Sequence, residues 1–177
     1  MKKLDVKKMT VAAMLIAVGV VLPSFTGGIP QVGKMLLPMH LPVMIAGFAL
    51  GGPWGALVGA VTPLLRSSFF IFPVMYPNAV TMAFELAAYG LITGLLYRSW
   101  KGPKVLRIYG PLLCAMLGGR LVWGLMQTIL VGLLGSGFSL AAFWAGAFAT
   151  ALPGVVLQLV IVPLVIYALE KAGYLKK

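Results

Sequence analysis

Long apolar runs separated by short segments rich in glycine, proline or lysine make up most of the chain. A helix needs about 20 apolar residues to cross the hydrocarbon core of a bilayer. The runs predict six membrane-spanning helices, over residues 9–25, 38–51, 54–65, 78–97, 109–134 and 140–169. We therefore expect an all-α integral membrane bundle in which residues 1–177 form a single transmembrane domain.

Prolines and charges divide some of these runs. Pro63 is expected to break the short third span, with residues 69–72 as an extension beyond it, and Pro153 is expected to break the long sixth span or leave it tilted. A basic connection from Arg98 to Arg107 is expected between the fourth and fifth spans. The irregular spans are therefore predicted to be the third and the sixth.

The N-terminal segment has the charged start and apolar middle of a secretory signal. Four lysines precede the first apolar run, but that run ends in Pro23, Ser24 and Phe25 with no small-residue cleavage pattern. Everything downstream is also membrane sequence. We interpret the segment as the first span.

Lysine and arginine are distributed unequally between the two predicted sides of the membrane. Six spans place eleven of them with the termini and the connection after the fourth span, and only Lys34 and Arg66 on the opposite side. Basic residues are retained on the cytoplasmic side of membrane proteins. Both termini are therefore predicted to be cytoplasmic.

Composition narrows the function. The chain has 177 residues, 61% hydrophobic and 10% charged, with a net charge of +11. The basic residues lie between apolar runs, which favours a role in topology over nucleic-acid binding. Phosphate-loop, zinc-hydrolase and nucleophile-elbow motifs are absent from the sequence, and one cysteine cannot form an intrachain disulfide. We expect neither an enzyme nor a metal or cofactor site, and ATP-driven work must come from a partner.

Two predicted spans carry polar residues along one face. Arg120, Trp123 and Gln127 share a face of the fifth span by their spacing of three and four residues, and Asn78 and Glu85 lie on a polar face of the fourth. Ionisable groups inside a membrane are costly and mark functional sites. We predict an enclosed site open toward the outside. The alternative is a structural ion pair between Glu85 and Arg120 that locks two helices together.

Further residues have two interpretations each. His40 and Arg66 are expected near the outer interface, either as interfacial anchors or as ligand contacts. Ala13 and Ala17 are four residues apart on the first span, and small residues at this spacing permit close approach of another helix. That helix belongs either to this chain or to a partner.

Four segments together resemble the substrate-binding S components of bacterial energy-coupling factor (ECF) vitamin transporters. The segments are Lys7-Lys8-Met9-Thr10 leading into Ala13-x-x-x-Ala17, His40-Leu-Pro-Val-Met-Ile-Ala-Gly, Gly51-Gly52-Pro53-Trp54-Gly55, and the stretch from Tyr76-Pro-Asn-Ala to Glu85-Leu-Ala-Ala-Tyr-Gly-Leu. With the small, basic, six-span pattern, the resemblance extends over nearly the whole chain.

This resemblance implies a monomeric, multi-pass bundle in a bacterial cell membrane that binds a vitamin near its extracellular face. It implies that Ala13 and Ala17 dock onto a transmembrane scaffold (T) subunit that carries two ATPase subunits. It also implies that the first outer loop and the outer halves of spans four to six line the pocket.

The charges suggest a class of ligand. Lys34, Arg66 and Arg120 give the outer half three cations against Glu85, which favours an anionic vitamin. Pantothenate is the first choice, before niacin or a folate, with the aromatic side chains packed on its remaining atoms. These aromatic residues are Trp123, Trp144 and Phe148. The alternative is a neutral pyridoxine-like or pyrimidine compound that contacts Glu85, Asn78 or Gln127.

Two other classes compete with the S-component interpretation. A self-sufficient small transporter or channel would use its intramembrane charges as an ion or proton relay. A structural subunit of a larger membrane complex would bind no small ligand. Vitamin binding separates the first two classes from the third, and dependence of uptake on ATP and added subunits separates the first from the second.

Overall fold

The computed structural model describes residues 5–26, 35–70, 72–132 and 139–175, without the side chains at positions 140, 142, 147 and 148. Every element within these ranges is helical. In chain order they are α1 (Val6–Val21), η1 (Leu22–Thr26), α3 (His40–Leu50), α4 (Gly52–Phe69), η2 (Met75–Ala79), α5 (Val80–Ser99), α6 (Lys104–Gly132), α7 (Leu140–Trp144), η3 (Ala145–Ala149) and α8 (Leu152–Lys171).

Four helical stretches of the described chain are long and apolar enough to cross a membrane. They are Val6–Phe25, Met75–Ser99, Lys104–Gly132 and Leu152–Lys171. The helix α3 is apolar but shorter, and α4 provides the remaining predicted span. The protein is thus an all-helical, multi-pass membrane protein. Its count of six spans and the side on which its termini lie stay predictions.

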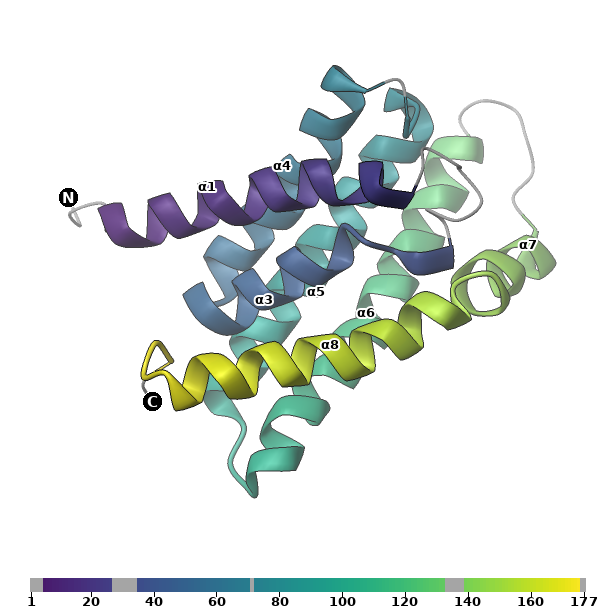
Figure 1. Ribbon diagram of the computed structural model, residues 1–177. Helices are drawn as coiled ribbons and strands as arrows, with labels where there is room; N and C mark the ends of the chain where they lie inside the picture. Colours follow the sequence, from purple (N-terminus) through teal and green to yellow (C-terminus); the bar gives the residue numbers. More distant parts are fainter. Residues whose placement is uncertain (1–4, 27–34, 71, 133–138, 176–177) are drawn as a thin grey trace.

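Helix α5 packs against α3, α4 and α6, while α1 covers α3 and α4, and α8 packs along α3 and α6 (Figure 1). The start of α1 and the end of α8 lie at the same end of the bundle, which we call the terminus end (Figure 1). The starts of α3 and α8 lie away from it, in the half that we call the distal half.

The predicted break of the third span at Pro63 is wrong, because α4 continues through this proline to Phe69. Proline removes one backbone N–H and crowds the carbonyl four residues earlier, here that of Gly59. Neighbouring helices make such prolines tolerable within a membrane bundle. Here Gly59 packs directly on the backbone of α5, since a Cβ at this position would collide with the carbonyl of Leu86. Packing against α5 therefore holds the helix together across the proline.

Glycines permit the close approach of α4 and α5. A Cβ on Gly55 would lie 2.5 Å from the carbonyl oxygen of Gly90, and a Cβ on Gly94 would collide with the backbone of Gly52. Small residues spaced by four let helix backbones meet in a membrane. These contacts run along the antiparallel pair and fix the position of α5, which carries Glu85, against α4.

Helix α6 begins at Lys104, so Lys104 and Arg107 lie on a helix and not in the connection where we expected them. Both cations face Glu170 of α8. Lys104 Nζ lies 3.7 Å from Glu170 Oε2, and Arg107 Nη2 forms an ion pair with Glu170 Oε1. The Tyr97 hydroxyl of α5 donates a hydrogen bond to the same Oε1 atom at 2.6 Å. This Glu170 cluster joins α5, α6 and α8 at the terminus end and extends α6 by ordering its first turn.

The predicted break of the sixth span near Pro153 is confirmed. The chain turns at Thr150 and Ala151, between η3 and α8. Pro153 occupies the first turn of α8, where its missing N–H removes no intrahelical hydrogen bond. The proline therefore starts a new helix.

Candidate functional site

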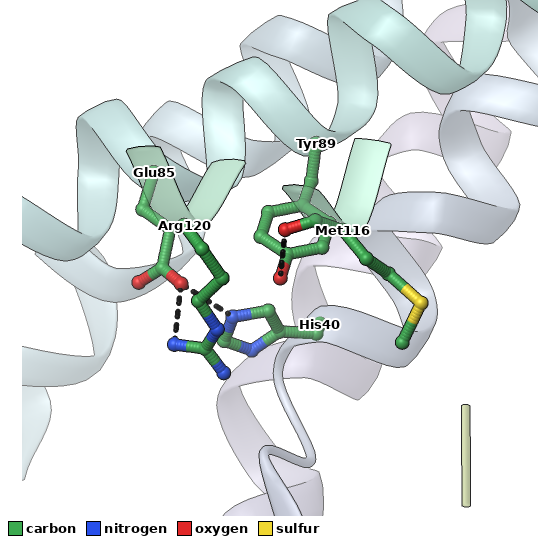
Figure 2. Close-up of polar contacts among 5 residues, drawn as sticks. All are labelled: His40, Glu85, Tyr89, Met116 and Arg120. Carbon is green, nitrogen blue, oxygen red and sulfur yellow. Dashed lines mark hydrogen bonds and ion pairs between the residues drawn. The ribbon is translucent and has the colours of Figure 1, made fainter. Parts of the chain in front are cut away.

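A buried carboxylate in the distal half accepts hydrogen bonds from two other helices. Glu85 of α5 is 2% exposed, and its Oε1 atom accepts from Arg120 Nη1 of α6 at 2.8 Å. His40 Nε2, at the start of α3, lies 3.2 Å from the same oxygen (Figure 2). A carboxylate only accepts, so His40 carries a proton on Nε2. We call these three residues the Glu85 cluster.

Tyr89 supports the cluster from one side. Its ring meets the His40 imidazole edge to face, with 4.9 Å between the ring centroids. Its hydroxyl donates to the backbone carbonyl oxygen of Met116 on α6 at 3.3 Å (Figure 2). A Cβ on Gly119 would collide with the Tyr89 ring, so a glycine is required where α6 passes over it.

Helical spacing explains this arrangement. Glu85 and Tyr89 are four residues apart on α5, and Met116 and Arg120 are four residues apart on α6. Residues at this spacing share one face of a helix. Two adjacent turns of α5 therefore face two adjacent turns of α6, and His40 fits against both turns of α5.

Several polar atoms of the cluster have no hydrogen-bond partner within the described part of the protein. They are Nδ1 of His40 and both Nε and Nη2 of Arg120. Buried polar groups are almost always hydrogen-bonded, and an unpaired one carries a desolvation penalty. Arg120 thus has two nitrogen atoms, Nε and Nη2, that can donate hydrogen bonds. The arrangement is suited to binding a small polar molecule.

The cluster carries no net formal charge when His40 is neutral. Arg120 contributes one positive charge, and Glu85 neutralises it at hydrogen-bonding distance. The ion pair expected as an alternative therefore exists, and it leaves donor atoms of Arg120 available as well. The structural and ligand-binding interpretations are compatible with each other.

The other predicted cations do not join this cluster. Arg66, at the distal end of α4, donates through Nη1 to the backbone carbonyl of Val20 and, at 3.0 Å, to Ser24 Oγ. Its guanidinium group also lies 4.4 Å from the centroid of the Phe70 ring. Arg66 therefore ties α4 to the end of α1. Lys34 lies outside the described residues.

His40 is wholly buried, at 1% exposure, so its side chain does not reach the surface of the bundle, while its depth in the membrane stays a prediction. Its α3 backbone packs among α4, α5 and α8, and these helices exclude it from any surface. The pairing with Glu85 compensates for that burial, because the imidazole N–H finds a charged acceptor there.

The predicted aromatic and amide residues extend from the cluster toward α7. Trp123, one turn beyond Arg120, stacks on Phe143 with 6.1 Å between ring centroids. Gln127 and Asn78 are both partly buried, on α6 and η2. Trp144 is 56% exposed. Phe148 lies in η3, and its side chain is not among those that the structure describes.

One buried polar residue was missed by the sequence analysis. Gln158 of α8 has no exposed surface, and neither Oε1 nor Nε2 of its amide has a partner among the described residues. It stands alone in the apolar run from Gly154 to Pro163. A single amide inside a predicted span was the signal that would have found it.

Ala13 and Ala17 are both exposed on α1, on the side that faces away from the bundle. Ala12 and Gly19 lie on the buried side, and a Cβ on Gly19 would meet Thr62 of α4. Packing within the chain therefore uses the other small residues of this helix, and the two alanines remain available on its outer surface.

These features define a class of protein: a multi-pass helical membrane protein with a buried polar site whose charges offset each other. All helices of the described residues belong to the bundle. The family model for the substrate-specific component of ECF transporters matches residues 7–166. The chain belongs to this family, whose members are transport subunits and not enzymes. Searches of curated proteins and of solved structures found no match.

Proposed function

We propose that this protein is the specificity subunit that binds a vitamin or vitamin precursor on the extracellular side of a bacterial cell membrane. It delivers the ligand for uptake driven by ATP hydrolysis in partner subunits. Membership of the ECF substrate-specific family supports the transport role. The observation that carries the binding role is the Glu85 cluster, a buried ion pair whose donor and acceptor atoms are incompletely used.

The ligand candidates come from two charge arguments. Pantothenate, niacin and a folate follow from an excess of cations in the outer half of the chain. Neutral pyridoxine-like or pyrimidine compounds follow if that excess is absent from the pocket. The pairing of Arg120 with Glu85, and the contacts of Arg66 with α1, support the neutral class.

Docking to the partner subunits would use the outer surface of α1. Ala13 and Ala17 are exposed there and leave room for the close approach of another helix. The partner would be a transmembrane scaffold subunit that carries two ATPase subunits. The exposure of both alanines supports a surface used between proteins over one used inside the bundle.

The test combines binding and uptake. Ala17→Trp is expected to abolish ATP-dependent vitamin uptake in vesicles that contain the complete transporter, because a bulky side chain prevents close helix approach. Vitamin binding by the purified subunit should stay within twofold of wild type. Leu164→Trp, on the exposed surface of α8, is the matched control and should retain uptake. Equal loss of binding and uptake in Ala17→Trp would reject this docking surface.

The same vesicles test the competing class. A self-sufficient transporter would take up the vitamin when the purified chain is the only protein present. Under the proposal, uptake requires the scaffold and ATPase subunits together with ATP. Uptake by the chain alone would therefore reject the proposal.

A further inference from the structure

Gln158 is a buried amide that nothing in the described protein satisfies. Its side chain has no exposed surface, and both its donor and its acceptor lack partners. A structural polar side chain in a membrane helix bonds to a neighbouring backbone or side-chain group, as the Thr93 hydroxyl does with the carbonyl oxygen of Tyr89 at 2.7 Å. Gln158 makes no such bond among the described residues, so its amide is available to a partner beyond them.

The contacts of α8 give the depth of Gln158 relative to α3. One turn before it, Gly154 packs on the backbone of Met35 and Leu36, just ahead of the start of α3. At the other end, the ring of Phe48 on α3 meets Tyr97, which donates to Glu170 on α8. The two helices therefore run in the same direction. Gln158 falls near the first turn of α3, which begins with His40.

The contact between Tyr97 and Glu170 gives a second indication of where Gln158 lies along the bundle. Glu85 precedes Tyr97 by twelve residues on α5, and Gln158 precedes Glu170 by twelve residues on α8. Both helices run away from the distal half toward this contact. Twelve residues correspond to about 18 Å of helix. Gln158 therefore lies in the distal half of the bundle, as Glu85 does.

Gln158 also lies on the inner face of α8. The buried residues of this helix include Gly154, Gln158, Val162 and Ile166, spaced by four. Val162 and Ile166 belong to the same apolar core as Tyr89 and Met116. The amide therefore points into the bundle in the distal half, near the first turn of α3 that carries His40.

We propose that Gln158 is a specificity-determining residue of the vitamin site, and that the substrate is a neutral molecule with adjacent hydrogen-bond donor and acceptor groups. A primary amide donates and accepts side by side, so it pairs with a carboxamide, a hydroxyl group or the edge of a nitrogen ring. The unpartnered nitrogen atoms Nε and Nη2 of Arg120 supply further donors. This inference rests on the proposed function and adds the class of ligand.

The charge of the site argues for a neutral substrate. Glu85 already neutralises Arg120 at 2.8 Å. A bound carboxylate would add a second negative charge beside Glu85 in a buried place, where an uncompensated charge is costly. A neutral polar ligand meets the unpartnered atoms without that penalty.

The experiment measures binding to the purified full-length chain by calorimetry with matched neutral and anionic compounds. The pairs are nicotinamide with nicotinate and panthenol with pantothenate, and pyridoxine, hydroxymethylpyrimidine and folate complete the set. We expect a neutral compound to bind most tightly, at least tenfold tighter than any anionic one. Tighter binding of an anionic compound would overturn the neutral class.

The role of Gln158 is tested with Gln158→Met, which keeps most of the volume and removes both polar atoms. We expect affinity for the tightest neutral compound to fall at least tenfold, with no decrease in the thermal midpoint of the ligand-free protein. Thr93→Val is the matched control, because it removes a buried hydroxyl that is bonded within its own helix. It should lower the thermal midpoint and leave affinity unchanged.

The outcomes separate this inference from the function on which it rests. Failure of every compound to bind the wild-type chain would overturn the proposed function, and this inference with it. Vitamin binding that Gln158→Met leaves unchanged would overturn the inference alone. A lowered thermal midpoint with unchanged affinity would assign Gln158 a structural role.

Discussion

The Glu85 cluster and the Glu170 cluster are built from the same parts at different depths of the bundle. Each places one carboxylate opposite two basic side chains from other helices. In the Glu170 cluster the side chains of Lys104 and Arg107 are 59% and 20% exposed. In the Glu85 cluster those of His40 and Arg120 are 1% and 7% exposed.

This difference in exposure distinguishes the Glu170 cluster, which ties helices together near the surface, from the Glu85 cluster, which we propose as the binding site. Arg107 Nε and Glu170 Oε2 lack hydrogen bonds, but Oε2 faces the ammonium group of Lys104, which reaches the surface. The unpartnered atoms of His40 and Arg120 have no such exposed neighbour on their carboxylate. Ion pairs of the same kind therefore join helices at the terminus end and leave buried polar atoms without hydrogen bonds in the distal half.

The largest difference between the two clusters is expected in the stability that is lost when each carboxylate is removed. Glu85→Leu leaves Arg120 buried without a counter-charge, and breaking a buried ion pair costs about 3–5 kcal/mol. Glu170→Leu removes hydrogen bonds to a charged group near the surface and should cost about 1.5–3 kcal/mol, toward the lower end. The free energy of unfolding, measured by denaturant titration in mixed micelles, provides the comparison.

The double variant Glu85→Leu/Arg120→Met is the control for that comparison. Removing both charges should restore most of the stability lost in Glu85→Leu, because no uncompensated charge remains in the bundle. Equal losses in Glu85→Leu and Glu170→Leu would show that depth does not distinguish the two clusters.

Ligand affinity should respond to the cations of one cluster alone. Arg120→Gln is expected to weaken vitamin binding at least tenfold, about 1.4 kcal/mol, because it removes N–H donors that have no partner in the protein. Arg107→Gln, in the Glu170 cluster, should leave the dissociation constant within twofold of wild type. Calorimetric titration of both variants measures this, and equal weakening would contradict a binding role confined to the distal half.

The smallest effect is expected for Lys104. Its side chain is 59% exposed and lies 3.7 Å from Glu170 Oε2, so the ion pair is largely screened by water. Lys104→Ala should lower the free energy of unfolding by less than about 1 kcal/mol, and high salt should reduce the difference further. A larger, salt-independent loss would mean that Lys104 contributes through packing on Tyr167.

Much of the helical architecture could be predicted from the sequence, because apolar runs and their charged ends are local signals. The positions of α3, α5 and α6 follow the runs closely. The face shared by Arg120 and Trp123 and the pairing of Arg120 with Glu85 also follow from helical spacing and from the cost of a buried charge. Continuity through Pro63 did not follow, since it depends on contact with another helix.

The rest of the site depends on tertiary packing. His40 adjoins a loop in the sequence, and only the packing of α3 among four other helices buries it. Arg66 was predicted to be one of three cations that attract an anionic ligand, whereas its hydrogen-bond partners are a carbonyl of α1 and a serine beyond that helix. The carbonyl carries no sequence signal, and Ser24 lies 42 residues from Arg66, so the sequence does not indicate that the two meet.

The neutrality of the Glu85 cluster has a consequence for the electrical work of transport. Moving one elementary charge across a membrane potential of 100 mV involves about 2.3 kcal/mol. Because Glu85 offsets Arg120 at 2.8 Å, this pair can shift along the membrane normal without moving net charge through the voltage. With a neutral passenger, the Glu85 cluster and its ligand would then add no voltage dependence to the rate of delivery.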